Sequence, residues 1–132
     1  QLFGDIFAVG LALSAVVLLV GGVGVVAIMM ISVTERTREI GVRKALGATA
    51  GTIRWQFLVE AATLTSIGAL IGLAIGGVLA WVIRTNSSIP ASLPTSIVVT
   101  ALAASAITGV AFGMLPAIRA SKLDPVEALR HE

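Results

Sequence analysis

Three long apolar runs dominate this sequence, and each is long enough to cross a lipid bilayer as a helix. No charged residue occurs from Ile6 to Val33, and a second uncharged stretch covers residues 61–83. A third run extends from Ile97 to Leu115 and meets Pro116 at its end. About 20 apolar residues suffice to span the hydrocarbon core, so the pattern predicts an all-α, polytopic membrane protein. We place its three transmembrane helices at residues 1–33, 57–83 and 97–118.

The composition is typical of a chain in lipid. Of the 132 residues, 57% are hydrophobic and only 12% are charged, about half the charged fraction of a soluble domain. The mean hydropathy is +1.03. A signal peptide is not expected, because Asp5 precedes the first run and no basic segment does. No cysteine is present, and the net charge of +2 gives no reason to expect a nucleic-acid partner.

The positions of the basic residues predict the orientation of the three helices. Eight of the nine Lys and Arg residues fall in two segments, 34–56 and 119–132, and only Arg84 lies in the loop at 84–96. Short loops rich in Lys and Arg remain in the cytoplasm. We therefore expect segment 34–56 and the tail at 119–132 to be cytoplasmic and the loop at 84–96 to be extracytoplasmic.

The segment 34–56 carries the pattern of a short amphipathic helix. Glu39 and Arg43 stand four residues apart, with the acid first, which is the favoured order for a helical ion pair. Val42 and Leu46 form an apolar pair at the same spacing. Gly47 is a suitable C-cap. The pattern predicts a short charged helix that ends near Gly47.

Two kinds of partner suit this charged helix. It can lie on anionic headgroups through its basic residues, or it can enter a groove on a protein. Glu35 and Glu39 favour the protein, because a headgroup-binding helix gains nothing from acidic side chains. Thr49 or Thr52 is then expected to begin the helix that runs into the second span.

The C-terminal tail has a helix signal of its own. Asp124, Pro125 and Glu127 match the N-cap, N1 and N3 positions of a helix, which is a capping-box arrangement. The sequence therefore predicts a short cytoplasmic helix through Arg130. This helix adds a second surface beside segment 34–56.

Two rows of small residues predict close helix packing. In lipid, helices associate largely where small side chains let the backbones approach. The second span has Gly68, Gly72 and Gly76 at a spacing of four, and the third has Gly109 and Gly113 at the same spacing. Each row lies on one face of its helix. We expect both rows to be packing faces, either within the subunit or between subunits.

Glu60 is the clear acid inside the spans. It lies one turn from the start of the second span, where a carboxylate costs far less than at the bilayer centre. Glu60 is therefore expected to reach the interface, or to pair with Arg54 through a neighbouring helix. The apolar runs contain no His, Asp or Cys, so we expect no enzyme and assign no catalytic, cofactor-binding or metal-ligating residue.

Two longer stretches resemble the signatures of a known family. VTERTREIGVRKALGA at 33–48 and LPAIRASKLDPVEALRHE at 115–132 are similar to the two signatures of the FtsX-like permeases of ABC transporters, in particular their MacB-like branch. QFLVEA at 56–61 and the glycine-rich helix after it extend the resemblance over nearly the whole chain. By contrast, GATAG at 47–51 is not a phosphate-binding loop, because no Gly-Lys-Ser/Thr follows it.

The resemblance implies a permease subunit that couples ATP hydrolysis on a cytoplasmic ATPase to movement of an extracytoplasmic domain. Such mechanotransmission would serve the efflux of drugs, peptides or lipid-like substrates. It also implies that a first helix and the extracytoplasmic domain precede residue 1, and that this chain holds helices two to four. Segment 34–56 then contains the coupling helix, assisted by Asp124, Pro125 and Glu127. The residues expected to contact the ATPase are Glu35, Arg38, Glu39, Ile40, Arg43 and Lys44.

The same resemblance implies the partners and the location. The ATPase, fused or separate, would hold ATP and Mg²⁺, with no cofactor in this chain. Other expected partners are a second permease subunit, in a homodimer or a heterodimer, the bilayer of the bacterial inner membrane and a periplasmic adaptor. The alternatives are a lipoprotein-releasing permease and a membrane signalling or scaffold subunit without transport. A division-type FtsX protein is disfavoured, because such proteins lack the ERTREIG run.

Overall fold

The computed structural model describes residues 2–88 and 90–130, which form five helices and no strand. Residues 1 and 89 and the last two residues of the C-terminal signature lie outside this part. Three helices are long, namely α1 (Leu2–Glu35), α3 (Ala50–Asn86) and α4 (Thr95–Ser121), and two are short, namely α2 (Thr37–Ala45) and α5 (Pro125–Arg130). Each long helix is apolar and long enough to cross a membrane. The predicted all-α fold with three membrane helices is thereby confirmed.

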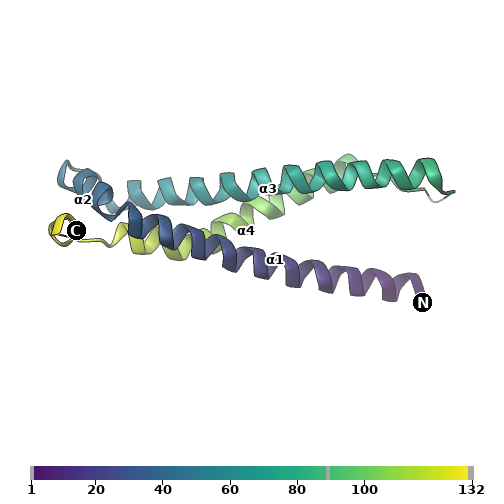
Figure 1. The fold of residues 1–132 in the computed structure, drawn as a ribbon, viewed down its shortest axis with the longest axis horizontal. Coiled ribbons are helices and arrows are strands. Elements are labelled where there is room, and N and C mark those ends of the chain that lie inside the picture. The colour runs from purple at the N-terminus through teal and green to yellow at the C-terminus, as the bar shows by residue number, and fades with distance from the viewer. Residues whose placement is uncertain (1, 89, 131–132) are drawn as a thin grey trace.

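The long helices form an open and elongated bundle (Figure 1). The short helices α2 and α5 lie at one end, and the N-terminus lies at the other. Helix α4 lies near α1 at the end that holds α2 and α5, and near α3 toward the end that holds the N-terminus, so α4 crosses between α1 and α3. The N-terminal half of α1 diverges from the other two long helices.

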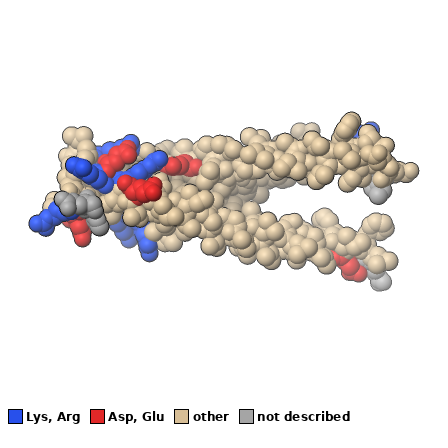
Figure 2. Space-filling view, in the orientation of Figure 1, with Lys and Arg blue, Asp and Glu red and all other residues tan. Residues whose placement is uncertain are grey.

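Charged side chains gather at the end that holds α2 and α5 (Figure 2). Among the described residues, only Asp5 and Arg84 carry charge at the opposite end. We call the end that holds α2 and α5 the charged end, and we call the opposite end the far end. The helices between the two ends expose mainly apolar side chains, as a lipid environment requires.

The buried core lies toward the charged end. It joins residues from α1, α2, α3 and α4, and its members are Met29, Val33, Ile40, Ile53, Phe57, Ala61, Ala117 and Ala120. Because the short helix α2 contributes Ile40 to this cluster, α2 is packed against the long helices and is not surrounded by solvent.

The row of small residues on α4 lies against α3. A Cβ added at Gly113 would lie 2.5 Å from the Ala61 Cβ, and one added at Gly109 would lie 2.9 Å from the Ala61 carbonyl oxygen. On the same side of α4, Ser105 Oγ donates to the Thr65 carbonyl at 2.6 Å. The two backbones therefore approach closely because α4 has no side chain at these glycines.

The row on α3 has a different environment. Within the described residues, nothing lies within 4 Å of a Cβ added at Gly68, Gly72 or Gly76. Helix α3 meets α4 through Ala61 and Thr65 instead. The described part of the chain leaves the row on α3 open, so packing through it against another helix stays a prediction.

Candidate partner-docking site at the charged end

Helix α2 continues α1 across a one-residue bend at Arg36. The Arg36 amide donates to the Ser32 carbonyl, and the Ile40 amide donates to the Arg36 carbonyl, both at 3.0 Å. Helical hydrogen bonding therefore crosses the bend. Thr37 Oγ1 donates to the Val33 carbonyl at 2.9 Å, and side-chain bonds of this kind often bend helices.

A glycine turn ends α2 and leads the chain into α3. Gly47 has a φ of 103°, a left-handed conformation that glycine adopts without strain. Its amide donates to the Lys44 carbonyl at 3.1 Å. The next amide donates to the Arg43 carbonyl at 3.0 Å, which completes a Schellman motif. Thr49 then caps α3, and its hydroxyl accepts a backbone N–H of the first turn at 3.2 Å.

One face of α2 packs inward. Ile40 is 4% exposed and belongs to the core. Gly41 lies against α5, where an added Cβ would lie 2.7 Å from a methyl group. Lys44 is half-buried, and its Nζ donates to the carbonyls of Ser121 and Leu123, the latter at 2.7 Å. Ile40 and Lys44, two of the residues expected to contact an ATPase, therefore point into this chain.

A second side of α2 is tied to α3 through Arg43. Its Nη2 donates to Glu39 Oε1 at 2.5 Å, in the helical pair expected from their spacing. Its Nη1 donates to Gln56 Oε1 of α3 at 2.6 Å. Both bonds are at the exposed flank of α2. Arg43 is therefore held in place within the chain.

Glu60 pairs with Arg36 and not with Arg54. A carboxylate oxygen of Glu60 and a guanidinium nitrogen of Arg36 are 3.6 Å apart, and the two side chains are 43% and 49% exposed. The expectation of an Arg54 partner is wrong, because residues six apart on one helix lie on different faces. Arg36 reaches Glu60 from the bend between α1 and α2.

A pair this exposed contributes little to stability. We expect a double-mutant cycle of Arg36→Ala and Glu60→Gln to give a coupling energy of about 0.5 kcal/mol. Unfolding free energies of the full-length protein in detergent micelles measure it, and the coupling should weaken at high salt. Arg38→Ala replaces Arg36→Ala in the control cycle, which should show no coupling. A coupling energy above ~2 kcal/mol would show instead that the pair is desolvated.

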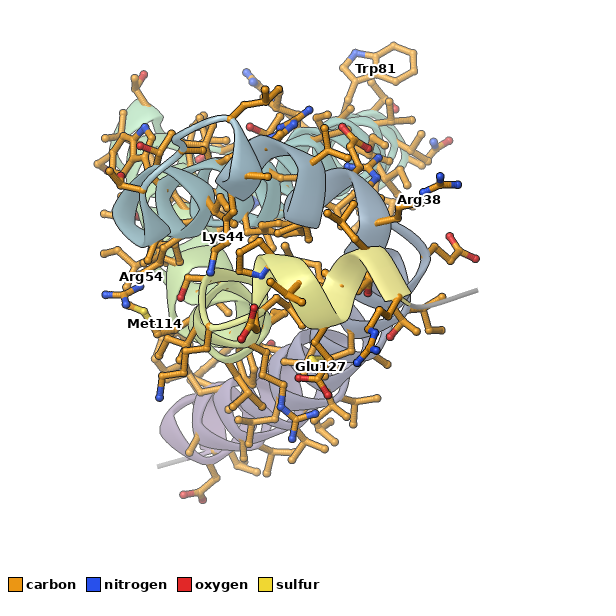
Figure 3. The ribbon with its side chains drawn as sticks, turned by 90° about the vertical axis from the view of Figure 1, so that its left-hand side faces the viewer. Arg38, Lys44, Arg54, Trp81, Met114 and Glu127 are labelled. Carbon is orange, nitrogen blue, oxygen red and sulfur yellow. The ribbon has the colours of Figure 1, made fainter. Side chains whose placement is uncertain are left out.

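The remaining face of α2 is exposed. Leu46 is 84% exposed and Val42 is 43% exposed. Arg38 also projects away from the bundle (Figure 3), and Glu35 is exposed at the end of α1. We call Arg38, Val42 and Leu46 the outer face of α2. Exposed apolar side chains with charges around them are typical of a surface that binds another protein.

Helix α5 lies beside α2 at the charged end (Figure 3). Asp124 Oδ1 accepts the Val126 amide at 2.9 Å, and the helix begins at Pro125. Asp124 and Pro125 thus have the geometry of an N-cap and an N1 residue. Glu127 lines a hollow of about 350 Å³ between α5 and the ends of α1 and α4.

Sequence reasoning missed three residues that hold α2 in place. Gly41 had a visible signal. A glycine inside a short helix lowers the stability of that helix, so its presence indicates that a neighbour packs closely there. The sequence carried no such signal for Gln56 or Arg36, since a long side chain can reach several partners from either position. The site is therefore more strongly connected to α3, α4 and α5 than the charge pattern indicates.

The fold and this site define a class, namely a polytopic helical membrane protein with a charged helical cap at one end of the bundle. A family model described as FtsX-like permease C-terminal matches residues 11–125. The chain belongs to this family, which confirms the resemblance seen in its two signatures.

Individual relatives carry names from the same family of transporters. The chain is 50% identical over 121 residues to YknZ, an uncharacterized ABC transporter permease of Bacillus subtilis, with 92% of this chain and 30% of YknZ covered. It is 42% identical over 132 residues to the macrolide export ATP-binding/permease protein MacB of Rhodopirellula baltica, with 100% of this chain and 19% of that protein covered. The chain thus spans less than a third of the length of these curated relatives.

Proposed function

We propose that this chain is the C-terminal membrane part of an ABC transporter permease, and that the outer face of α2 docks on the cytoplasmic ATPase of the transporter. The observation that carries the proposal is the division of α2 into faces. Ile40 and Lys44 are used inside the chain, whereas Leu46 and Val42 project from it. Family membership supports the kind of partner, because the relatives are named as permeases or ATP-binding/permease proteins.

A groove on a protein suits the outer face better than a lipid surface. Leu46 is almost fully exposed at the tip of the hairpin between α2 and α3. Exposed charges of both signs lie on the same short helix, including Arg38 and Glu39. Anionic headgroups would repel the acids, while a groove can bury an apolar anchor within a charged rim.

The charged end is proposed to face the cytoplasm from the bacterial inner membrane. Eight of the nine Lys and Arg residues belong to the segments at that end, where Figure 2 shows basic side chains together. Basic residues beside short membrane connections favour the cytoplasmic side. This orientation presents α2 to a cytoplasmic ATPase.

Movement, and not passage of a substrate, is the proposed task of the three spans. A hollow of about 580 Å³ opens between α1, α3 and α4, and none of the described residues that line it is charged. The hydroxyls of Thr65, Ser105 and Thr108 in its wall all donate to backbone carbonyls. A path for polar substrates would require free polar groups. Helix α1, with 34 residues and thus about 51 Å long, can instead carry a displacement of α2 to the far end.

A charge placed on the outer face tests the proposal. Leu46→Asp is expected to reduce the ATPase retained by the detergent-solubilised full-length permease about 10-fold or more, because Leu46 is the exposed apolar anchor. If permease and ATPase form one polypeptide, a protease cut between them precedes the pull-down. Membrane insertion and the unfolding temperature should remain those of the unchanged protein.

Ala50→Asp is the matched control. Ala50 is exposed at the same end and begins α3, where an acidic residue is tolerated by the helix dipole. It adds the same charge outside the outer face, so the ATPase should stay bound. Full retention of the ATPase by Leu46→Asp, with transport intact, would show that the outer face is not the docking surface.

A further inference from the structure

We propose that Lys44 is a positioning residue that fastens α2 to the end of α4, so that a movement of α2 also moves α4. This inference rests on the proposed docking of α2 on an ATPase. It assigns to Lys44 a role inside the permease, although its place in the charged segment suggests a direct contact with the ATPase.

The contacts of Lys44 join two separate helices. Its Nζ donates to the carbonyls of Ser121 and Leu123, the latter at 2.7 Å. Ser121 is the last residue of α4 and is 2% exposed. In Figure 3, Lys44 points from α2 toward the end of α4 and the start of α5. Within residues 2–88 and 90–130, the structure shows no other hydrogen bond or ion pair from α2 to α4 or to the residues after it.

The end of α4 requires a donor from outside that helix. In a continuing helix, the Ser121 carbonyl would accept the amide four residues later. That residue is Pro125, which has no N–H. The negative end of the α4 dipole lies at the same place, and an ammonium group supplies both the opposite charge and several donors. Lys44 therefore supplies the donor that the Ser121 carbonyl lacks because Pro125 follows four residues later.

Lys44 also fixes the register between α2 and its neighbours. Ile40 packs in the core together with Ala117 and Ala120 of α4, and Gly41 lets α5 approach the same face. Apolar contacts of this kind permit sliding, whereas charge-assisted hydrogen bonds to two carbonyls require one position. Without Lys44, α2 can follow the ATPase while α4 stays behind.

Distance measurements on the full-length permease with its ATPase in lipid nanodiscs test this role. Spin labels on cysteines at Phe7 and Thr100, both exposed, report the separation of α1 and α4 with and without a nonhydrolysable ATP analogue. Lys44→Met should enlarge the nucleotide-dependent change in this separation at least about twofold, because α1 then follows α2 while α4 stays behind. The amount of ATPase retained should equal that of the unchanged protein. A loss of folding or of a docking contact would instead lower this amount.

Conservative variants and a neighbour provide the controls. Lys44→Arg keeps a charged donor and should give the shift of the unchanged protein, and Lys44→Gln keeps a donor without the charge and should give an intermediate shift. If Lys44→Met does not insert into the membrane, the Gln variant carries the test. Lys122→Met removes an exposed lysine at the same end of α4 and should change nothing.

The outcomes separate this inference from the proposed function. An unchanged shift in Lys44→Met, with the ATPase bound, overturns the positioning role and leaves the docking proposal standing. Equal loss of bound ATPase and of the shift overturns it too, because Lys44 is then a docking contact. If the unchanged permease binds no ATPase, the proposed function itself fails.

Discussion

Gly109→Leu is expected to force α3 and α4 apart and to lower the stability of the permease by about 3 kcal/mol or more. A Cβ at this position would lie 2.9 Å from the Ala61 carbonyl oxygen and 3.0 Å from the Ala62 Cα, and it would also collide with the Thr65 hydroxyl. Two of these three atoms belong to the backbone of α3, which cannot rotate away as a side chain can. The helices must therefore separate, and the bond from Ser105 to Thr65 is lost with the contact.

The unfolding temperature of the full-length permease in detergent micelles measures this effect. Gly10→Leu is the control, because nothing lies within 4 Å of a Cβ at Gly10 and the position is exposed. It replaces glycine with leucine inside a membrane helix in the same way, and the better helix propensity of leucine should leave stability equal or slightly higher. Equal unfolding temperatures for the two variants would mean that α3 and α4 do not pack as the structure shows.

The spans and the helix ends could be predicted from the sequence because they depend on residues close together in the chain. The length of an apolar run decides whether it can cross a membrane. Gly47 and Thr49 end one helix and begin the next through bonds that reach only a few residues. Asp124 does the same for α5.

The contacts between helices could not be predicted in the same way. Small residues at a spacing of four occur on both α3 and α4, yet among the described residues of these two rows only Gly109 and Gly113 meet the other helix. A glycine permits close approach without attracting any particular partner. The choice of faces depends on the packing of all the helices together, including the core around Phe57 and Ala61.

The charged segment shows the same limit at the level of single side chains. Helical periodicity separates Ile40 and Lys44, which are four residues apart, from Val42 and Leu46, which share another face. It does not show which of the two faces is buried. The resemblance to a family identified the segment as a whole. The structure shows in addition that Lys44 bonds to carbonyls at the end of α4 and that Leu46 is exposed.

Gly41→Leu is expected to detach α5 from α2. An added Cβ at Gly41 would lie 2.7 Å from the Ala128 Cβ and 3.5 Å from the Pro125 carbonyl oxygen. Helix α5 has six residues and α2 is its main helical neighbour, and a helix this short is not stable alone. Amide hydrogen exchange in residues 126–130 should therefore rise by roughly 100-fold, as measured by mass spectrometry on the full-length permease in detergent.

Two further variants decide whether the contact between Gly41 and Ala128 causes this effect. Gly51→Leu is the control, because the nearest atom to its added Cβ is the Thr49 hydroxyl oxygen at 3.9 Å, and exchange in α5 should not change. Gly41→Ala combined with Ala128→Gly moves the methyl group from α5 to α2, so the collision disappears and protection should return. Fast exchange in this double variant, or slow exchange in Gly41→Leu, would show that something other than the close approach of α2 holds α5 in place.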